Sequence, residues 1–571
     1  MILLAGNTNT WTYARGADSL EAVTKRGQVT RTAPRSDLGS GFGRREMAER
    51  RVDQFQIDGF AEGRILVQRC AECAILHNPP RAMCPNCHSL EWEHAACGGL
   101  GTVYSWIVPR HGALDGETHI VAVVELEEGV RLLSRIRDVA IADMRNGLPV
   151  EARFEEDEQS GKNLVFRPAG TAPKPAAVID RDWHPVPESR PRRPKDVLWE
   201  RTAISGIGQT EFSKDSGRAE ISLAAEACLA AIKDAGLTPA DIDGMVTFTQ
   251  ETNSEVALMG NLGIPELTFD ARGLGGGMAA TACMQIAASA VLSGAATNVL
   301  VYRAFNERSG RRFGVPARRD GAPAARSLNT PAAIYALWYQ RYMDTFGVSN
   351  EDLGRYSVVA RKHAAGNPNA WFHRRPITLE EHQQSRWIVE PVLRLLDCCQ
   401  ESDGGVALVV SSLDQAEDGP NPPVRLLAAA QGYAKGNSGP GPGPLESDLS
   451  RFADCRVSAR QAFRDAGLSP GDIGAAMIYE NFTPLVFLTL EELGFCGPGE
   501  AKDFIAEGHI EIGGTLPVNT HGGLLGEAYI HGLNNTLEAV RQLRGVSSNQ
   551  VEDCQNVLVS NGVGTLIYGR A

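Results

Sequence analysis

Apolar and polar positions alternate differently in two parts of the chain. Between residues 50 and 168, after a helix-like opening, short runs rich in β-branched and aromatic residues predict β-strands. They are Thr102–Val108, His119–Glu127 and Val130–Ile136. Beyond about residue 198, Ala-rich stretches with helical spacing lead into apolar runs such as Gly244–Phe248 and Ala475–Tyr479. The first part predicts a small β-domain and the second a larger α/β domain.

A ten-residue motif occurs twice in the second part. Lys233–Ile242 (KDAGLTPADI) and Arg464–Ile473 (RDAGLSPGDI) differ only by Lys for Arg, Thr for Ser and Ala for Gly. The second copy begins 231 residues after the first, which is far longer than a solenoid period. The repeat therefore predicts a duplicated half-domain, with a βαβ arrangement and a parallel sheet in each half.

Two segments lack such patterns. Residues 1–48 are rich in Arg, Thr, Gly and Ser and predict a flexible arm. Residues 170–197 are rich in Pro and Arg and predict an extended linker. The expected organisation is thus this arm, a β-domain over 49–169, the linker, and an α/β domain over 198–571.

Composition narrows the class of protein. A chain of 571 residues is too long for one core, and its 60 glycines suit an α/β protein. The net charge of −13 argues against general nucleic-acid binding. No apolar run reaches the ~20 residues that span a bilayer, and the first residues lack a basic, secretory-type start. We therefore expect a cytoplasmic protein with no membrane span.

Four of the twelve cysteines form one tight cluster. Cys70, Cys73, Cys84 and Cys87 make a CxxC–x10–CxxC pattern, which can bring four thiolates to a tetrahedral metal. Because all four ligands are cysteine, no position stays open for water, and we expect a closed structural zinc site. Iron in a rubredoxin-like site is the alternative metal. A redox role is disfavoured because nothing beside these pairs looks like a thioredoxin βαβ unit.

The unit around this cluster resembles an acyl-CoA-associated family with a rubredoxin-like zinc ribbon and an OB-fold β-barrel. The resemblance is carried by GFAEGRILVQRCAEC, PPRAMCPNCHSLEWE, GTVYSWIV and VAVVELEEGVRLLSRI, from about Phe55 to Ala169. Such domains accompany thiolase-like proteins and enoyl-CoA hydratases. The resemblance therefore implies an acyl-CoA context rather than oligonucleotide binding.

Residues 198–571 resemble the sterol-carrier and lipid-transfer branch of the thiolase superfamily. Besides the duplication, the resemblance rests on Leu292–Tyr302, Asp397–Ser412 and two loops, Met477–Pro484 (MIYENFTP) and Pro517–Gly532 (PVNTHGGLLGEAYIHG). It implies an α/β protein with a duplicated thiolase fold in α/β/α/β/α layers, joined to the zinc ribbon and the OB barrel.

The residues that a thiolase uses for thiolysis are absent. A thiolase places its nucleophilic cysteine at the start of a buried helix, and the resemblance puts that position at or near Gly277. Cys283, two turns further, is expected to pack in the core. In the loop of the second thiolase cysteine, Leu558 or Ser560 takes its place. Ordinary thiolysis is therefore disfavoured.

Instead, each loop carries a tyrosine where the thiolase family has His or Asn. Tyr479 and Tyr529 match the thiolase-like aldolases of steroid side-chain degradation, whose corresponding residues are catalytic. This resemblance implies a β-hydroxyacyl-CoA substrate with a tertiary hydroxyl on the steroid D-ring, cleaved to a 17-ketosteroid and propionyl-CoA. Such a carbon–carbon lyase needs a base, enolate stabilisation and an acid, but no acyl-enzyme. We expect Tyr529 as base and Tyr479 as acid, although the roles can be exchanged; a phenol near its usual pKa of ~10 must be perturbed or coupled.

Other residues of the two loops are candidates for supporting roles. His531 is expected to polarise the thioester oxygen, to tune Tyr529, or only to pack. Asn481 and His521 are expected to support the site. Gly522 and Gly523 are expected to allow a tight turn near the ligand. Asp403 in the SDGG motif is expected to be structural.

Binding of the CoA phosphates has one candidate, the arginine-rich segment Arg303–Arg326, whose alternative interpretation is a solvated loop. No redox cofactor is expected. By resemblance, we expect a homodimer through the thiolase-like domain and a MaoC-type enoyl-CoA hydratase as partner. Two rival functions remain: a thiolase or acyltransferase with a relocated nucleophile, which consumes free CoA, and a non-catalytic acyl-CoA carrier.

Overall fold

The computed structural model describes residues 53–110, 118–157, 161–171, 198–312, 328–434, 443, 445 and 447–571, and four short strands within residues 1–31. These strands, β1 (Leu4–Ala5), β2 (Thr10–Ala14), β3 (Leu20–Thr24) and β4 (Val29–Arg31), pair antiparallel in sequence order. The rest of the predicted arm (1–48) and the predicted linker after residue 171 lie outside the described residues. The chain divides into two compact units, Met1–Gln54 and Phe55–Ala571, which are described separately.

The second unit begins with a small ribbon and a barrel. Helix α1 (Gln54–Glu62) precedes a three-stranded sheet in the order β6 (Leu76–His77), β5 (Ile65–Cys70) and β7 (Trp92–Cys97). Five strands then form the barrel: β8 (Leu100–Pro109), β9 (Ile120–Leu126), β10 (Arg131–Ile136), β11 (Pro149–Asp157) and β12 (Gly161–Pro168). Their order is β11–β12–β10–β9–β8, and pairing of β11 with β8 closes the barrel. The three strands predicted here are confirmed as β8, β9 and β10.

A nine-stranded sheet runs through the rest of this unit. Its strands, in spatial order, are β15 (Phe269–Gly273), β14 (Gly244–Phe248), β16 (Asn298–Asn306), β19 (Asp403–Ser412), β13 (Thr202–Gln209), β20 (Val424–Gln431), β23 (Gly564–Arg570), β22 (Asn556–Ser560) and β21 (Ala475–Ile478). The two halves meet at β13 and β20, which pair only at Ala203–Arg425 and Ile204–Val424. The sheet is therefore two half-sheets joined by a short seam.

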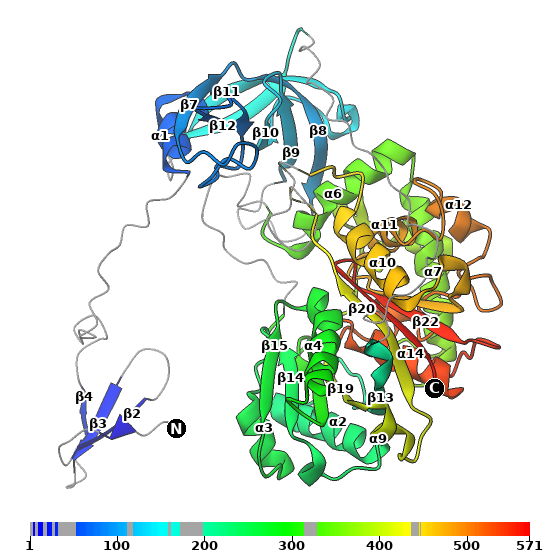
Figure 1. The fold of residues 1–571 in the computed structure, drawn as a ribbon. Helices are drawn as coiled ribbons and strands as arrows, with labels where there is room; N and C mark the ends of the chain where they lie inside the picture. Colours follow the sequence, from blue (N-terminus) through cyan, green and yellow to red (C-terminus); the bar gives the residue numbers. More distant parts are fainter. Residues whose placement is uncertain are drawn as a thin grey trace. The chain divides into compact units, whose positions relative to one another are not determined.

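Helices separate these halves into layers (Figure 1). Helices α4 (Ala280–Ser293) and α14 (Leu533–Arg544) contact strands of both halves and form the central layer. Helix α2 (Glu220–Asp234) covers the outer face of the first half, and α10 (Ala453–Ala466) that of the second. On β16, Val299 and Val301 pack with the central layer, whereas Leu300 and Tyr302 pack with α2, as the two-residue period of a strand requires. The expected α/β/α/β/α layering is confirmed.

The repeated motif ends the two outer helices. Gly236 and Gly467 follow α2 and α10 with φ of +73° and +67°, the left-handed conformation that glycine adopts at low cost. Thr238–Asp241 and Ser469–Asp472 then form matching capping boxes. The duplication therefore encodes the same helix-to-strand turn in each half.

The expectation of a parallel sheet in each half needs a correction. β14 pairs parallel with β15 and β16, and β21 pairs parallel with β22. However, β19 is antiparallel to both of its neighbours, and β23 is antiparallel to both of its own. Each half-sheet is mixed, because β19 and β23 are inserted beside the βαβ core of each half.

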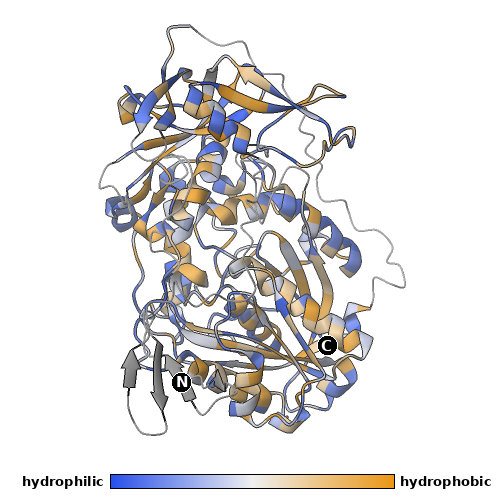
Figure 2. Cartoon of the chain, turned by 90° about the vertical axis from the view of Figure 1, so that its left-hand side faces the viewer, coloured by the Kyte–Doolittle hydropathy of each residue, from blue (hydrophilic) through white to orange (hydrophobic). Residues whose placement is uncertain are grey.

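The remaining helices and strands pack around the two halves and the barrel. They are α3 (Glu255–Leu262), α6 (Pro331–Phe346), α7 (Asn350–Gly366), α8 (Leu379–Gln384), β17 (Trp387–Glu390), β18 (Leu393–Arg394), α9 (Leu413–Glu417), α11 (Pro484–Glu492), α12 (Ala501–Ala506) and α13 (Gly523–Gly526). In Figure 2 the sheet strands are largely orange, whereas many helices carry both orange and blue residues, as expected for one buried face. Among the described residues, no helix combines the length and the apolarity that crossing a membrane requires.

The barrel and the α/β part of this unit share a hydrophobic core. Strand β8 pairs with β17, with Pro109 opposite Val389 and Val108 opposite Glu390. The hydroxyl of Ser105 on β8 donates to the carbonyl of Leu337 on α6, at 2.5 Å. Because the other end of α6 lines the pocket described below, the barrel braces a wall of the candidate site.

Candidate active site

The two loop tyrosines meet in the structure. The hydroxyl oxygens of Tyr479 and Tyr529 lie 2.8 Å apart and share a hydrogen bond, although the residues are 50 positions apart in the sequence. Their exposed fractions are 3% and 9%. The structure thus brings together the two residues that the sequence predicts as an acid–base pair. Their catalytic roles stay predictions.

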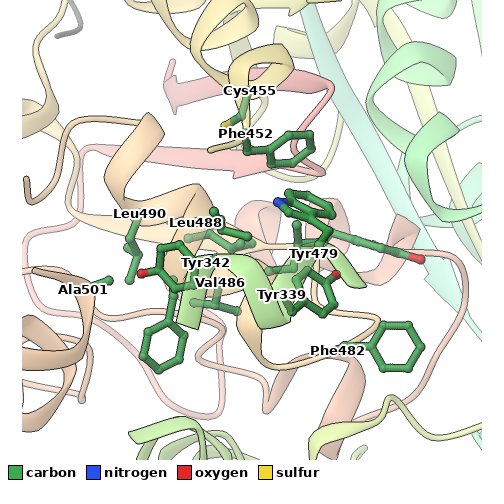
Figure 3. Packing of buried hydrophobic residues seen from close by; sticks show 14 of the residues in the cluster. Tyr339, Tyr342, Phe452, Cys455, Tyr479, Phe482, Val486, Leu488, Leu490 and Ala501 are labelled. Atoms are coloured by element: carbon green, nitrogen blue, oxygen red, sulfur yellow. The ribbon is translucent and has the colours of Figure 1, made fainter. Parts of the chain in front are cut away.

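Tyr479 is held at the end of β21, the edge strand of the second half-sheet. It directly follows β21, and its N–H donates to the carbonyl of Ser560. The side-chain amide of Asn519 accepts from the N–H of Ile478 and donates to its carbonyl, both at 2.8 Å, as a neighbouring strand would. Figure 3 shows Tyr479 at one side of the core cluster, with its hydroxyl directed away from Val486. The tyrosine therefore has a fixed position.

Tyr529 is held by the segment Gln400–Ser402. Its N–H donates to the hydroxyl of Ser402, and Glu401 forms an isolated parallel bridge with Tyr529. Unlike Tyr479, Tyr529 lines a pocket of about 460 Å³. Tyr529 is therefore the member of the pair that faces the pocket.

Gly277 adjoins Tyr479. It starts a 3-10 turn (Gly277–Ala279) that leads into α4, so it lies at the amino end of a buried helix, as the resemblance implied. A Cβ atom at position 277 would overlap the hydroxyl and ring of Tyr479. The space of a cysteine side chain is thus filled by the tyrosine. Gly277 itself does not line the pocket, and binding of a ligand by it stays a prediction.

Burial makes both tyrosines weak acids. Loss of solvent raises the pKa of each phenol well above its usual value. Within the pair, the hydrogen bond favours the charged form of Tyr529 and raises the pKa of Tyr479 further. Both phenols therefore keep their proton at neutral pH, and either hydroxyl can donate in the hydrogen bond between them.

His531 is part of a buried hydrogen-bonded series with Arg303 and Glu251. Its Nδ1 accepts from Nε of Arg303 at 3.1 Å, and Arg303 forms an ion pair with Glu251 at 2.8 Å, with side chains 1% and 0% exposed. Burial, together with Arg303, lowers the pKa of His531 well below its usual value. Because Nδ1 is an acceptor, the neutral ring carries its hydrogen on Nε2. The ring lies edge-on to Tyr529, with centroids 5.2 Å apart.

The remaining loop candidates lie around the pair, but away from the pocket lining. Asn481 is 7% exposed, and its Oδ1 has no hydrogen-bond partner among the described residues. His521 is buried and contacts Oδ1 of Asn535 through Nε2 at 3.2 Å. Gly522 and Gly523 have φ of +101° and +61°, which confirms a tight turn. Their close neighbours are Ala364 and Glu480, and contact with a ligand stays a prediction.

The pocket lining is rich in cations. Lys214, Arg308, Arg312, Arg361 and Arg386 line it, against the two carboxylates Glu307 and Glu401. Burial and the nearby Arg308 lower the pKa of Lys214 to about 8, and burial lowers that of Arg361 to about 10. Phe482, Leu525 and Tyr529 add apolar and aromatic walls.

The arginine-rich segment is divided between two roles. Arg303 is buried against His531, whereas Arg308 and Arg312 line the pocket. Residues 313–326 lie outside the described part of the chain. Asp403, expected to be structural, accepts from the N–H groups of Ser216, Arg308 and Ser309, and so holds two loops of the pocket wall.

The cysteines near the site are packed thiols. Cys283 lies in the core as expected, and burial raises its pKa to about 12. Cys398 and Cys399 line the pocket, and burial raises the pKa of both thiols. In the loop of the second thiolase cysteine, Leu558 is in the core and Ser560 bonds within its own turn. Asn561, which sequence reasoning missed, approaches Gly277 with Nδ2 at 3.4 Å from the carbonyl.

The ribbon cysteines converge as their spacing predicts. The sulfur atoms of Cys70, Cys73, Cys84 and Cys87 all lie within 4.8 Å of one another, with Cys70 to Cys87 at 3.4 Å and Cys73 to Cys84 at 3.6 Å. Zinc–sulfur bonds of about 2.3 Å require sulfurs roughly 3.8 Å apart in a tetrahedron. The four thiols are therefore positioned to bind one metal ion.

Family models match three segments. Residues 58–93 match the rubredoxin-like zinc ribbon domain of ChsH2, 94–155 the C-terminal OB-fold domain of ChsH2, and 445–569 a thiolase C-terminal domain-like family. In addition, a probable enoyl-CoA hydratase alpha subunit of Thermomonospora curvata is 37% identical over 122 residues, 21% of this chain and 38% of that relative.

Longer relatives cover the α/β part. A steroid side-chain-cleaving aldolase of Thermomonospora curvata is 56% identical over 385 residues, which are 65% of this chain and 98% of the relative. A 17-hydroxy-3-oxo-4-pregnene-20-carboxyl-CoA lyase of Mycobacterium tuberculosis is 52% identical over 388 residues, 65% of this chain and 99% of the relative. A solved Ltp2–ChsH2(DUF35) aldolase matches with a TM-score of 0.61 and 53% identity, over 66% of this chain and 99% of that chain.

Proposed function

Because this chain belongs to the family of thiolase-like aldolases that cleave steroid side chains, we propose that Tyr529 and Tyr479 are its acid–base pair. The chain is a carbon–carbon lyase of the retro-aldol type. Its proposed substrate is a steroid β-hydroxyacyl-CoA of the 17-hydroxy-20-carboxyl type, on which the Mycobacterium tuberculosis relative is named to act. The observation that carries the assignment of the pair is the 2.8 Å hydrogen bond between the two hydroxyls, with one of them in a pocket wall.

The reaction balances without a cofactor. A base removes the proton of the tertiary 17-hydroxyl, and the oxygen forms the carbonyl of a 17-ketosteroid as the bond between C17 and C20 breaks. The electron pair of that bond becomes the thioester enolate, and protonation at C20 gives propionyl-CoA. A thiol nucleophile has no part in these steps.

Tyr529 is the proposed base. It lines the pocket, and the hydrogen bond from Tyr479 favours its charged form. The proton that Tyr529 takes from the substrate hydroxyl can pass along the 2.8 Å bond, so Tyr479 is the proposed acid that serves the enolate. The amino end of α4 adjoins Tyr479 through Gly277, and the helix dipole there favours negative charge on the pair or on the enolate.

His531 is the proposed donor to the thioester oxygen. Arg303 occupies Nδ1, which leaves the hydrogen on Nε2, and a neutral imidazole donor stabilises an enolate without giving up its proton. The ring lies beside Tyr529, the proposed base. Asn481 and His521 are proposed to keep the two loops in place.

The cationic part of the pocket lining is the proposed site for the CoA phosphates. Arg308, Arg312 and Lys214 line the same pocket as Tyr529, and guanidinium groups bind phosphate through paired N–H bonds. Phosphates held there would place the acyl thioester toward the tyrosines.

The ribbon and the assembly carry further proposals. We propose structural zinc at the four cysteines, because four-cysteine sites of this spacing close the coordination shell of zinc.

Homodimerisation is proposed through β15, the edge strand that leads to Gly277. A MaoC-type enoyl-CoA hydratase is the proposed partner because hydration supplies the tertiary hydroxyl, and a hydratase subunit is among the relatives. A cytoplasmic location stays a prediction.

One experiment separates this function from its rivals. The protein is incubated with a tertiary 17-hydroxy-20-carboxyl-CoA steroid in the absence of free CoA, and the products are identified by mass spectrometry. A 17-ketosteroid with an equal amount of propionyl-CoA is expected. Products that form only after free CoA is added would indicate a thiolase or acyltransferase instead. Tight binding without any cleavage would indicate a carrier.

A further inference from the structure

The segment Cys398–Ser402 lies between the two tyrosine loops. On one side, the N–H of Cys399 donates to the carbonyl of Asn481, next to the Tyr479 loop. On the other side, the N–H of Gln400 donates to the carbonyl of Leu524, and Ser402 accepts from Tyr529. The backbone of Gln400 is therefore hydrogen-bonded to the Tyr529 loop. The backbone of the preceding residue, Cys399, is hydrogen-bonded to the Tyr479 loop.

The side chain of Gln400 has a fixed orientation. Its Nε2 donates to the carbonyls of Gly526 and Glu527, both at 3.0 Å. Because carbonyl oxygens only accept, the amide nitrogen must face them, and Oε1 must face the other way. Gln400 lines the pocket, is 9% exposed, and its Oε1 has no hydrogen-bond partner within the described part of the chain. A buried acceptor without a partner indicates that the ligand completes the site.

We propose that Gln400 is a substrate-binding residue. Its Oε1 accepts a hydrogen bond from an amide N–H of the pantetheine arm of the acyl-CoA. This inference rests on the proposed function. The single hydrogen of the β-hydroxyl donates to Tyr529, and the thioester group has no donor. The remaining donors near the reacting carbon are the amide N–H groups of the arm. Gln400 thus fixes how far the thioester enters beside Tyr529.

The test uses the full-length protein and two ligands that are not cleaved. The first is a steroid acyl-CoA without the β-hydroxyl; the second is the same ligand with an ester oxygen in place of the amide N–H nearest the thioester. Binding to the wild type and to Gln400→Met is measured by calorimetry. The exposed Gln384→Met on α8 is the matched control.

A lost neutral hydrogen bond weakens binding about fivefold to tenfold. We expect the ester ligand to bind the wild type that much more weakly, and the amide ligand to lose a similar factor on Gln400→Met. The two changes together should cost little more than either alone, because both remove one bond. If the loss from the ester ligand and the loss from Gln400→Met multiply when combined, the proposal is overturned. Equal binding of the amide and ester ligands to the wild type would also overturn it, without the use of any variant.

A third ligand excludes the hydroxyl as the donor. On Tyr529→Phe, which is expected to bind the substrate without cleaving it, the β-hydroxylated and dehydroxylated acyl-CoA are compared with and without Gln400→Met. Coupling to the hydroxyl instead of the amide would contradict the proposal. Cleavage by the wild type without free CoA is measured separately, so failure of the proposed function is distinguishable from failure of this inference.

Discussion

Tyr479 fills the space that any side chain at position 277 would need. A Cβ atom on Gly277 would overlap the hydroxyl oxygen and two ring carbons of this tyrosine. The start of α4 therefore has room for a nucleophilic side chain or for the tyrosine pair, but not for both. The absence of the thiolase cysteine and the presence of Tyr479 are two aspects of one steric arrangement.

Gly277→Ala is expected to disturb the pair directly. The added methyl group forces Tyr479 to move, which costs about 1–3 kcal/mol of stability as overpacking. It also breaks the 2.8 Å bond to Tyr529, so kcat should fall at least tenfold. Thermal unfolding and steady-state kinetics check both effects. Gly260→Ala in α3, where a Cβ meets nothing within 4 Å, should leave kcat unchanged; wild-type kcat in Gly277→Ala would contradict the steric argument.

Removing either phenolic hydroxyl should abolish most of the activity while the fold is kept. Positioned acid–base groups contribute roughly 10²–10⁴-fold to rates, so Tyr529→Phe and Tyr479→Phe should each lose that much in kcat. Because the two hydroxyls act through one hydrogen bond, the double variant should be little worse than the worse single variant. Full activity of both single variants would refute the assigned roles. Tyr433→Phe, at an exposed tyrosine, is the matched control.

The pH dependence follows from the raised phenol pKa. At neutral pH a phenol whose pKa lies above its usual value keeps its proton, and each rise in pH increases the small phenolate fraction. Therefore kcat/KM should rise with pH from about 6 to 9, by up to tenfold per unit. His531, with its pKa lowered, stays neutral throughout and should add no acidic limb near pH 6.5. A plateau below about pH 8 would indicate another base.

His531 should be replaceable only by a side chain that keeps both hydrogen bonds. Glutamine can accept from Arg303 and still donate an N–H, whereas leucine can do neither. His531→Gln is expected to keep kcat within about tenfold of the wild type, and His531→Leu to lose on the order of 10²-fold or more. KM for the CoA ester should change little in either, since the donor serves the enolate. Equal kcat in the two variants would assign His531 a packing role.

Metal analysis should find one zinc per chain. Zinc has a filled d shell and leaves the protein colourless, whereas iron bound to four thiolates absorbs visible light. Cys84→Ser should remove the metal and lower the unfolding temperature of the ribbon. The Tyr479–Tyr529 pair lies in the α/β domain, away from the ribbon cysteines in the sequence. Cys84→Ser is therefore expected to keep part of its cleavage activity. Complete retention of zinc in Cys84→Ser would exclude this ligand set.

Local patterns determined how much of the fold was predictable. The duplicated motif specified the helix ends and caps of both halves, because Gly236 and Gly467 act within a few residues. The antiparallel positions of β19 and β23 depend on long-range pairing, which no local periodicity reports. The CxxC spacing was sufficient for the metal site since its ligands lie in two short turns.

The site was predictable as a set of residues, but not as a geometry. Resemblance identified Tyr479 and Tyr529, yet their mutual hydrogen bond joins two loops that meet only in the folded chain. The pairing of Asn519 with Ile478 and the approach of Asn561 to Gly277 are likewise tertiary contacts. Gln400 lies within Asp397–Ser412, but its orientation depends on the carbonyls of Gly526 and Glu527, which are distant in the sequence.

The barrel and the α/β body belong to one polypeptide, and β8 pairs with β17 where they meet. A contact between two parts of one chain forms at an effective concentration that does not depend on the dilution of the protein. The barrel therefore cannot be lost by dissociation, and weak contacts such as that of Ser105 with Leu337 are sufficient to keep α6 braced. The stoichiometry of the two parts is fixed by translation.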